Sequence, residues 1–423
     1  MASNPEKHIR QQYFAITKQS VWASPSGLDD SYYIMPFDAG SFKPIPAVDT
    51  GQLNYYSSAG IMKQDSRNNV DSLTGLHRIP FSGVAMLERI APLFMGAFQS
   101  VVEDAGTPYA KNFTPADTVL DFTQNDGMMH TIILGNYSAA IDSGSTTSAT
   151  ANKLVDSGAT FSTTGVEIGD TVENGDTSTF SYVTAIDSET QLTLADNIFA
   201  VGGGGEAYAI VRSDMVRFTE CLIDNLTFSV SNRSNGIDRY AKVSGEWISR
   251  RIYKNQYPSS VTKTALPASP TILNDSADYF TLNMVLTSSV GALTLSNLPW
   301  FNFTMQINNN VTPNGQTTGG MALNYRIAPT ITYTIDLPYN DDTFKALEHY
   351  IRGSNVAFDF GNGDGNTSGT FKIDGEKGVL TDNPYEFDGD YHMIRFQFEA
   401  LKPTSAGWNA QYVGFADAVD WGY

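Results

Sequence analysis

The chain has 423 residues and carries 26 Lys and Arg against 45 Asp and Glu, a formal net charge of −19. Such an acidic chain is not expected to hold DNA, RNA or anionic lipid through a basic surface. Hydrophobic residues make up 41% and charged residues 17%, so the chain can bury a core, and its many glycines and aromatic residues favour short strands joined by tight turns.

Two further features narrow the class of protein. The single cysteine, Cys221, excludes an intrachain disulfide framework and a cysteine-based zinc site. No apolar run is long enough for a membrane-spanning helix, and the first residues lack the apolar core of a secretory signal. We therefore expect a chain with no membrane span that is not secreted.

The first predicted helix lies in residues 84–98, directly after Gly83. Its apolar residues recur at helical spacing, at Val84, Leu87, Ala91, Phe94 and Phe98. Pro92 within this stretch predicts a kink or a split, because proline removes a backbone hydrogen bond.

Three later segments alternate apolar and polar residues with period two, which predicts strands with one buried face. Their apolar positions are Leu226, Phe228 and Val230; Phe301, Phe303, Met305 and Ile307; and Ile331, Tyr333, Ile335 and Leu337. A second helix is predicted over residues 341–352, with Phe344, Leu347 and Ile351 on one face. Asn340 or Asp341 can cap its start, and Gly353 stands where a C-terminal cap glycine belongs.

The two predicted helices begin two similar series of segments. Each is followed by a D-F-x-x-x-D-G sequence, at 121–127 and 359–365, and then by an Ile-Asp pair, at 223–224 and 373–374. A final alternating strand closes each series, and its matched positions are Tyr240, Val243 and Trp247 in the first and Tyr391, Ile394 and Phe398 in the second. The common order predicts two copies of one structural unit.

The first copy is interrupted by a stretch of different character. Residues 138–212 begin with a low-complexity Ser/Thr/Ala segment, continue as several short predicted strands and end in a glycine run. This pattern indicates an inserted β-rich module with neighbouring ends. The predicted organisation is an N-terminal arm 1–28, a first unit 29–137 and 213–260, the insert 138–212, a linker 261–270, a second unit 271–402 and a C-terminal arm 403–423.

No catalytic, metal-binding or cofactor motif emerges from the sequence, so we predict no enzyme activity and no cofactor. Residues 362–366 resemble part of a calcium loop but lack the required glycine and glutamate further on, so a hairpin turn is favoured. The glycine run 202–205 lacks the Lys-Ser/Thr of a phosphate loop. The histidines have no partners at ligand spacing.

Read in order, the first unit resembles the tail tube protein of long-tailed bacteriophages. The similarity rests on the Gly-Val-Ala-Met-Leu-Glu-Arg segment that begins at Gly83, on residues 108–115, on the strand 222–230 and on the strand 240–247. The second unit resembles the same fold. The resemblance implies two tandem β-sandwich units, each with one α-helix, plus the inserted small β domain.

The resemblance also implies a function. In that family six units form a ring, and stacked rings make the tube through which the genome leaves the virion. A chain with two units would build the ring from three copies, in a virion tail assembled in the host cytoplasm. The implied partners are the chain itself and the tape measure, tail-tip and neck or terminator proteins, while double-stranded DNA passes without specific binding. The insert is then expected on the tube exterior.

Two sets of residues are candidates for roles in such a tube. An acidic wall would repel phosphates, and the polar sides of the closing strands suggest Glu246 and Glu399 as lumen-facing acids, with Asp224 and Asp374 behind them. Aromatic residues in irregular segments are candidates for contacts between rings: Trp22, Tyr55, Tyr56, Trp408, Tyr412 and Trp421. Loss of residues 404–423 is expected to leave soluble rings that do not elongate.

Two other classes of protein fit the composition. A carbohydrate-binding or adhesive β-rich virion or fibre protein would also use acidic and aromatic residues. A head decoration or tail terminator protein is a further alternative. The repeated helix argues against an adhesin, and the oligomeric form of the purified protein separates all three.

Overall fold

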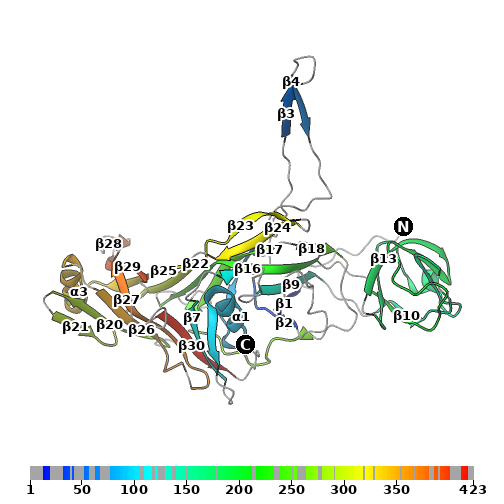
Figure 1. Ribbon diagram of the computed structural model, residues 1–423. Helices are drawn as coiled ribbons and strands as arrows, with labels where there is room; N and C mark the ends of the chain where they lie inside the picture. Colours follow the sequence, from blue (N-terminus) through cyan, green and yellow to red (C-terminus); the bar gives the residue numbers. More distant parts are fainter. Residues whose placement is uncertain are drawn as a thin grey trace. The chain divides into compact units, whose positions relative to one another are not determined.

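Figure 1 shows the computed structural model of the chain, in which strands predominate. The structure describes residues 13–19, 32–38, 41, 52–56, 62–66, 77–103, 109–116, 120–121, 129–135, 140–148, 150–177, 179–211, 216–232, 239–249, 251–254, 263–274, 279–289, 291–317, 320–326, 329–352, 355–365, 367–380, 385–388, 391–400 and 411–417. The predicted mainly β fold is confirmed. No helix in this described part is long and apolar enough to cross a membrane.

Contacts divide the chain into two compact units, which we describe separately. The larger unit contains residues 36–129, 222–250 and 266–423, and the smaller contains residues 1–35, 130–221 and 251–265. Both halves of the predicted repeat therefore contribute to the larger unit, whereas the predicted insert lies wholly in the smaller one.

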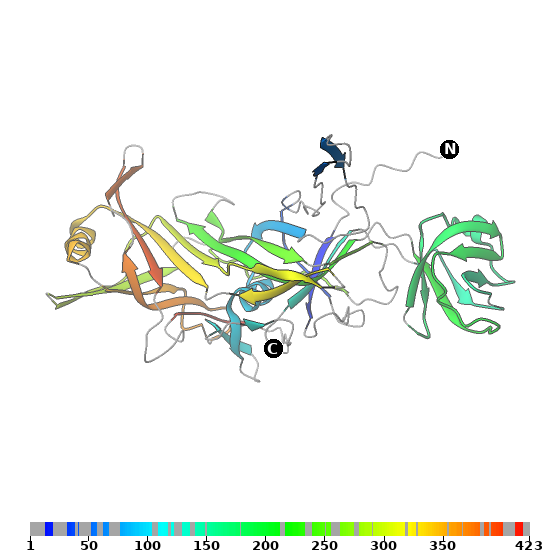
Figure 2. The same ribbon diagram turned by 45° about the horizontal axis from the view of Figure 1, so that its top comes forward.

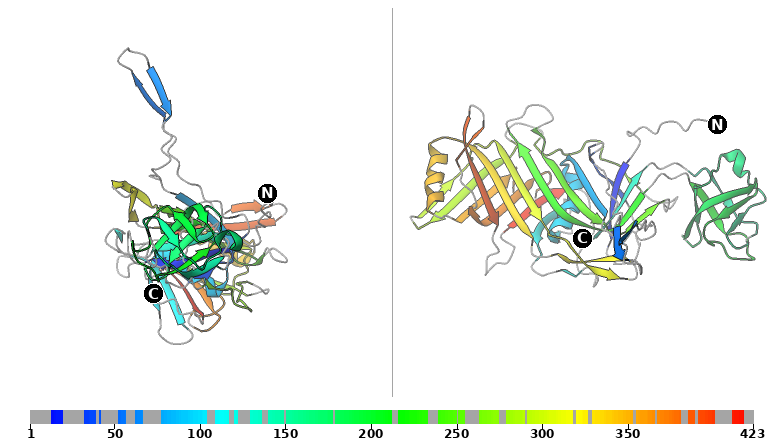
Figure 3. Two further views of the ribbon diagram at one scale, coloured as in Figure 1. Left: turned by 90° about the vertical axis from the view of Figure 1, so that its right-hand side faces the viewer. Right: turned by 90° about the horizontal axis from the view of Figure 1, so that it is seen from above.

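The larger unit is built around two antiparallel sheets, which we call layer 1 and layer 2. Layer 1 has the strand order β5-β17-β16-β22-β25-β29, with β28 beside β29. Several of its strands run side by side in the right-hand view of Figure 3. Their bounds are β5 His77–Val84, β16 Val216–Ser231, β17 Lys242–Ser249, β22 Asn302–Asn308, β25 Thr330–Pro338, β28 Tyr385–Asp388 and β29 Tyr391–Ala400. The three alternating segments are strands as predicted.

Layer 2 has the strand order β21-β20-β26-β27-β30-β7-β6. The bounds of its strands are β6 Gln99–Glu103, β7 Tyr109–Pro115, β20 Thr281–Ser288, β21 Gly291–Leu295, β26 Asn355–Gly361, β27 Phe371–Leu380 and β30 Gln411–Asp417. The layers meet where residues 378–380 of β27 pair with residues 398–400 of β29.

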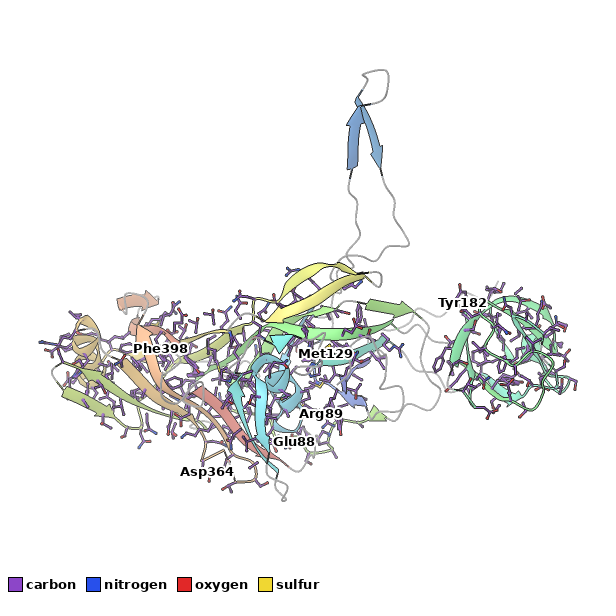
Figure 4. All side chains as sticks on the ribbon, viewed as in Figure 1. Glu88, Arg89, Met129, Tyr182, Asp364 and Phe398 are labelled. Atoms are coloured by element: carbon purple, nitrogen blue, oxygen red, sulfur yellow. The ribbon has the colours of Figure 1, made fainter. Side chains whose placement is uncertain are left out.

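Aromatic side chains fill the space between the layers. Phe303 of layer 1 stacks on Phe360 of layer 2 with ring centroids 4.0 Å apart, and Phe228 stacks on Phe371 at 5.2 Å. Phe398, labelled in Figure 4, packs edge-on against Phe358 at 5.3 Å. Because the Phe228–Phe371 contact joins a strand of the first half to a strand of the second, the halves share one core.

Helix α1 (Leu87–Phe98) is almost wholly buried, and Glu88 is the one residue of the helix that is partly exposed. It begins three residues later than predicted, because Val84 still belongs to β5. The helix runs unbroken through Pro92, so the predicted split is wrong. Proline cannot donate to the carbonyl of Glu88 four residues earlier, and the guanidinium of Arg89 donates to that oxygen instead, at 2.8 Å (Figure 4).

Helix α3 (Asp341–Ile351) begins as predicted at an Asn340 cap. The Asn340 side chain accepts from the backbone N–H groups of Asp342 and Thr343, and the Thr343 hydroxyl accepts from the Asn340 N–H at 2.8 Å. Two residues of the predicted apolar face are exposed, Phe344 at 51% and Ile351 at 75%, and the side chain of Leu347 lies outside the described part. Thr343 and Ala346 are buried instead. Gly353 lies outside the described residues.

The repeat is confirmed for its helices and closing strands. In both halves the strand before the helix pairs with the closing strand: β5 with β17, and β25 with β29. The register is the same, because the partner of Val243 is Gly83, four residues before α1, and the partner of Ile394 is Leu337, four residues before α3.

The two shorter matches within the repeat are wrong. The second D-F sequence lies in β26, beside β27, whereas the first lies at the two-residue strand β8 (Leu120–Asp121), which pairs with β24. Trp247 pairs with Ile223, but its equivalent Phe398 pairs with Leu380, so Ile373 does not occupy the place of Ile223. Short polar-apolar motifs recur by chance in strand-rich sequences, whereas helix and strand spacing reflects the fold.

The C-terminal segment differs from the predicted arm. Its residues 411–417 form β30, which lies between β27 and β7 in layer 2 and so joins the two halves. The N-terminal segment also contains a strand, β1 (Tyr13–Gln19), which pairs with β2 (Tyr32–Ile34) in the smaller unit. Neither segment is therefore free of regular structure.

The predicted insert contains a six-stranded sheet with the order β10-β15-β12-β13-β14-β11. Among the described residues these strands pair only with one another, and they enclose a core of their own that includes Phe161, Val172, Leu192 and Ile210. Its elements are β10 Asp142–Ser145, β11 Lys153–Val155, α2 Phe161–Thr164, β12 Thr171–Asn174, β13 Thr179–Ser188, β14 Gln191–Leu194 and β15 Ala207–Val211. We call residues 140–211 the insert module.

The remaining strands are short connections and hairpins. In the smaller unit β16 also pairs with β9 (Met129–Gly135) and β18 (Arg251–Lys254), and β19 (Lys263–Thr264) pairs with β2. In the larger unit β3 (Gln52–Tyr56) and β4 (Met62–Ser66) form a hairpin, and β23 (Thr312–Thr317) pairs with β24 (Gly320–Arg326).

Candidate functional site

The outward side of layer 1 is a broad polar face. Alternation turns the apolar residues of its strands into the core and leaves mainly Ser, Thr, Asn and Gln on the other side. We call this the polar face; its described members are Arg78, Ser82, Asn225, Thr227, Ser229, Ser231, Lys242, Ser244, Glu246, Asn302, Thr304, Gln306, Asn308, Thr330, Thr332, Thr334, Asp336, Arg395, Gln397 and Glu399. It crosses from the first half of the sequence to the second at the β16·β22 pair.

Glu246, the first candidate acid, belongs to this face but is neutralised there. Its carboxylate accepts from the Arg78 guanidinium at 2.6 Å, with the two side chains 18% and 56% exposed respectively. The two residues lie on neighbouring strands, β17 and β5. A half-exposed pair of this kind adds little stability but cancels the charge that Glu246 would present.

Asp336 is an acid of the same face that sequence reasoning missed. It is 3% exposed, and Arg395 holds both its oxygens, with Nε at 2.7 Å and Nη2 at 3.1 Å. The amide of Asn302 also donates to it, at 2.9 Å. Cross-strand pairing places Asp336 opposite both partners. The available signal was an acid that follows buried Ile335 in an otherwise threonine-rich polar series.

Glu399, the second candidate acid, is exposed on the polar face opposite Thr332. Over the described members the face carries three acids, Glu246, Asp336 and Glu399, and three bases, Arg78, Lys242 and Arg395. It is therefore hydrophilic and balanced in charge, which differs from the acidic wall expected from the net charge. Much of the acidity lies in the insert, where residues 138–212 hold ten acidic and two basic residues.

The other two candidate acids do not join the polar face. Asp224 is tied to a turn, because one carboxylate oxygen accepts from the backbone N–H of Val311 at 2.9 Å. Asp374 lies on the outward side of layer 2, where Lys372 contacts both it, at 2.8 Å, and Asp359, at 3.4 Å. Burial, and secondarily the charge of Asp374, raises the pKa of the Tyr333 phenol, which therefore stays neutral in the core.

The candidate aromatic contacts are only partly described. Tyr55 and Tyr56 lie in β3, opposite Lys63 and Met62 of β4. Tyr412 lies in β30 opposite Asp374, so its backbone is part of layer 2 of its own chain. Trp22, Trp408 and Trp421 lie outside the described residues.

The described residues do not gather into a constellation for chemistry. They include no group of three His, Cys, Asp or Glu side chains placed to hold a metal ion. Residues 362–370 connect β26 to β27 as the expected turn: the Asp364 carboxylate accepts from the Thr367 N–H at 2.9 Å, and the Asn362 side chain accepts from the Phe371 N–H at 2.6 Å. Cys221 is a buried free cysteine.

Both ends of layer 2 are open edges within the described part of the chain. Among the described residues, the strand registers pair β21 with β20 at one end and β6 with β7 at the other. Open edges present unpaired backbone groups that favour addition of another strand.

No family model matches this chain, and no curated protein matches it.

Proposed function

We propose that this chain is the tail tube subunit of a long-tailed bacteriophage. Three copies form a ring, and the rings stack into a tube that is assembled in the host cytoplasm and becomes part of the virion tail. The observation that carries the proposal is the side-by-side junction of two equivalent halves. In each half the strand before the helix pairs in the same register with the closing strand, and β16 of the first half pairs with β22 of the second over seven residues.

This junction supports assembly in a ring. Two equivalent halves placed side by side use a head-to-tail contact, and repetition of a head-to-tail contact gives either a closed ring or a filament. Three chains with two halves each supply six equivalent positions around a closed ring. The open edges of β21 and β6 support lateral extension of layer 2 in both directions.

The polar face of layer 1 is our candidate for the wall of the tube. A wall that carried many unpaired bases would bind phosphates tightly and retain DNA. On the polar face, Arg78 and Arg395 are each paired with an acid, and uncharged hydroxyl and amide groups predominate. Such a wall wets readily and holds DNA weakly. The conduit that we propose is thus polar and neutral, and its function is structural rather than enzymatic.

Electron microscopy of the purified protein tests the proposal. We expect stacked annuli with a continuous central channel and three chains per ring. Isolated monomers under all conditions, as expected for an adhesin, would refute it. Single rings that never stack would favour a terminator or decoration protein. Tape measure, tail-tip and neck proteins are the expected partners at the ends of such tubes.

The wall assignment has a separate test. Thr227→Lys with Thr332→Lys makes the polar face basic, and Asn283→Lys with Thr287→Lys adds the same charge to the outward side of layer 2. In assembled particles, DNA release should slow for the first pair and not for the second. The reverse result would move the wall to layer 2.

A further inference from the structure

Helix α3 presents an apolar patch to solvent. Tyr339 is 44% exposed, Phe344 51% and Ile351 75%. Phe344 and Ile351 are seven residues apart, so they share one face of the helix, and the rings of Tyr339 and Phe344 lie 6.1 Å apart. We call these three residues the α3 patch. The buried residues Thr343 and Ala346 are on a different face, and the helix contacts β20 and β21 (Figure 2).

The equivalent helix α1 shows what covers this position elsewhere in the molecule. Its first turn is held by the second half of the chain: the Glu88 carboxylate accepts from the Thr271 N–H at 3.1 Å, and the Leu87 N–H donates to the Thr271 carbonyl at 2.9 Å. Further along, the Phe94 ring lies 6.3 Å from that of Phe371 in β27. A helix at this place in one half is thus contacted by the half that follows it, in addition to β6 and β7 of its own half.

The α3 patch lies at the end of layer 2 that has no following half. Helix α3 contacts β21, the open edge strand at that end. At the opposite end is the open edge strand β6, where Val102 is 67% exposed. Both ends therefore combine an open strand edge with exposed apolar side chains, although they differ in sequence and structure.

We propose that the α3 patch and the β21 edge dock onto the β6 end of a second copy of this chain. The occupant is a second copy because the equivalent helix is already contacted by an equivalent half of this fold, and because the second strand edge needed for pairing is on the same chain. The contact is head-to-tail, so every copy uses each end once. It rests on the proposed function and names the surfaces that would join subunits around the ring.

The test removes the patch without touching the core. In the variant Phe344→Ser with Ile351→Ser, we expect the dissociation constant of the wild-type oligomer, measured by analytical ultracentrifugation, to rise by about 100-fold, because two apolar side chains lose their burial. The thermal unfolding temperature of the single chain should not fall, since both side chains are already exposed. The matched control is Ile168→Ser with Val201→Ser, which removes two exposed apolar side chains of the insert module, 68% and 64% exposed, and should leave assembly unchanged.

Cross-linking tests the second surface directly. Val102→Cys and Phe344→Cys in one chain should give a ladder of linked chains with a bis-maleimide, whereas either substitution alone should give no ladder, because a head-to-tail contact brings the two different sites together. Cys221 is buried and is common to all variants.

The outcomes separate this inference from the proposed function. A patch variant that assembles like the wild type, or a double cysteine variant that gives no ladder, overturns the inference. Neither result contradicts the proposed tube function. Wild-type oligomers that are lost in the patch variant but never form annuli support the inference and refute the tube. A wild type that stays a single chain at every concentration overturns both.

Discussion

The two tandem halves and the insert module pair their strands and bury their apolar residues in different ways. Strands of both halves interleave: β30 follows the second half in sequence yet lies between β27 and β7, and the Phe303–Phe360 and Phe228–Phe371 stacks span the two layers. The insert module keeps its strand pairs and its core within residues 140–211. The halves are therefore repeats without being independent domains, whereas the insert module has what an independent domain needs.

Truncation of the chain before β30 gives the largest expected effect. Removal of residues 404–423 would leave β27 and β7 without their shared neighbour, the strand β30. It would also take the buried Val413 out of the core. We expect the sandwich, as we call layers 1 and 2 of the larger unit together, to lose its cooperative unfolding transition, because a missing interior strand leaves two rows of backbone groups unpaired. Differential scanning calorimetry of purified protein measures this.

This expectation replaces the earlier one that trimming residues 404–423 leaves soluble rings. A truncated chain with an unchanged unfolding transition would show that β30 is dispensable and that the halves are held together without it. A truncation that ends after residue 417 retains β30 and is the matched control.

A core deletion in each region should act on that region alone. Phe360→Ala removes a fully buried ring that stacks on Phe303, and Phe161→Ala removes a fully buried ring that contacts Tyr208 in the insert module. Each should cost about 3–5 kcal/mol of its own region's unfolding free energy. Calorimetry should show two transitions, of which each variant lowers one.

The two variants serve as controls for each other. If either one lowered both transitions equally, the insert module and the sandwich would be a single cooperative unit, and the contrast between interleaved halves and an independent module would be lost.

Strand prediction succeeded wherever one face was buried. The alternation in residues 226–230, 301–307 and 331–337 follows directly from the two-sided surroundings of a strand, and each segment is a strand of layer 1. The same alternation placed Glu246 and Glu399 on the outward side of layer 1, as expected for the polar sides of the closing strands.

Other features depended on partners that a single sequence does not reveal. The apolar spacing of Phe344 and Ile351 was real, but it marks an exposed face of α3, since periodicity reports amphipathicity and not what covers it. The net charge of the chain did not predict that acids and bases balance on the polar face, because Arg78 and Arg395 meet their acids only through cross-strand pairing. Val84 at the start of the predicted helix satisfied helical spacing and strand alternation equally well.

His77 provides a smaller, pH-dependent effect that belongs to the sandwich alone. The residue is fully buried at the start of β5, and burial lowers the pKa of its imidazole from 6.5 to about 4. The unfolded chain therefore takes up a proton at a higher pH than the folded chain. Stability from this group is complete above pH 6.5 and falls as the pH drops towards 4, by about 3 kcal/mol in total.

His77→Phe should remove that part of the pH dependence. Urea unfolding of the sandwich at several pH values between 4 and 7 measures the slope, which is compared between variant and wild type so that any general loss of stability cancels. An equal fall in the variant would assign the pH dependence to other groups.

Excision of the insert module should have the smallest effect on the sandwich. Its ends are neighbours, because Asp142 in β10 pairs with Ile210 in β15, and the flanking strands β9 and β16 are paired next to it at Leu134 and Val216. In the second half, residues 362–370 make a comparable antiparallel connection between β26 and β27. A chain in which these nine residues replace residues 136–215 has a turn already used by this fold.

We expect the unfolding free energy of the sandwich in this chain to stay within about 0.5 kcal/mol of the wild type, as for changes away from the core. The same nine residues in reversed order control for turn sequence. A sandwich that unfolds without the insert module would show that the module supports it, and the division drawn between interleaved halves and independent module would then be wrong.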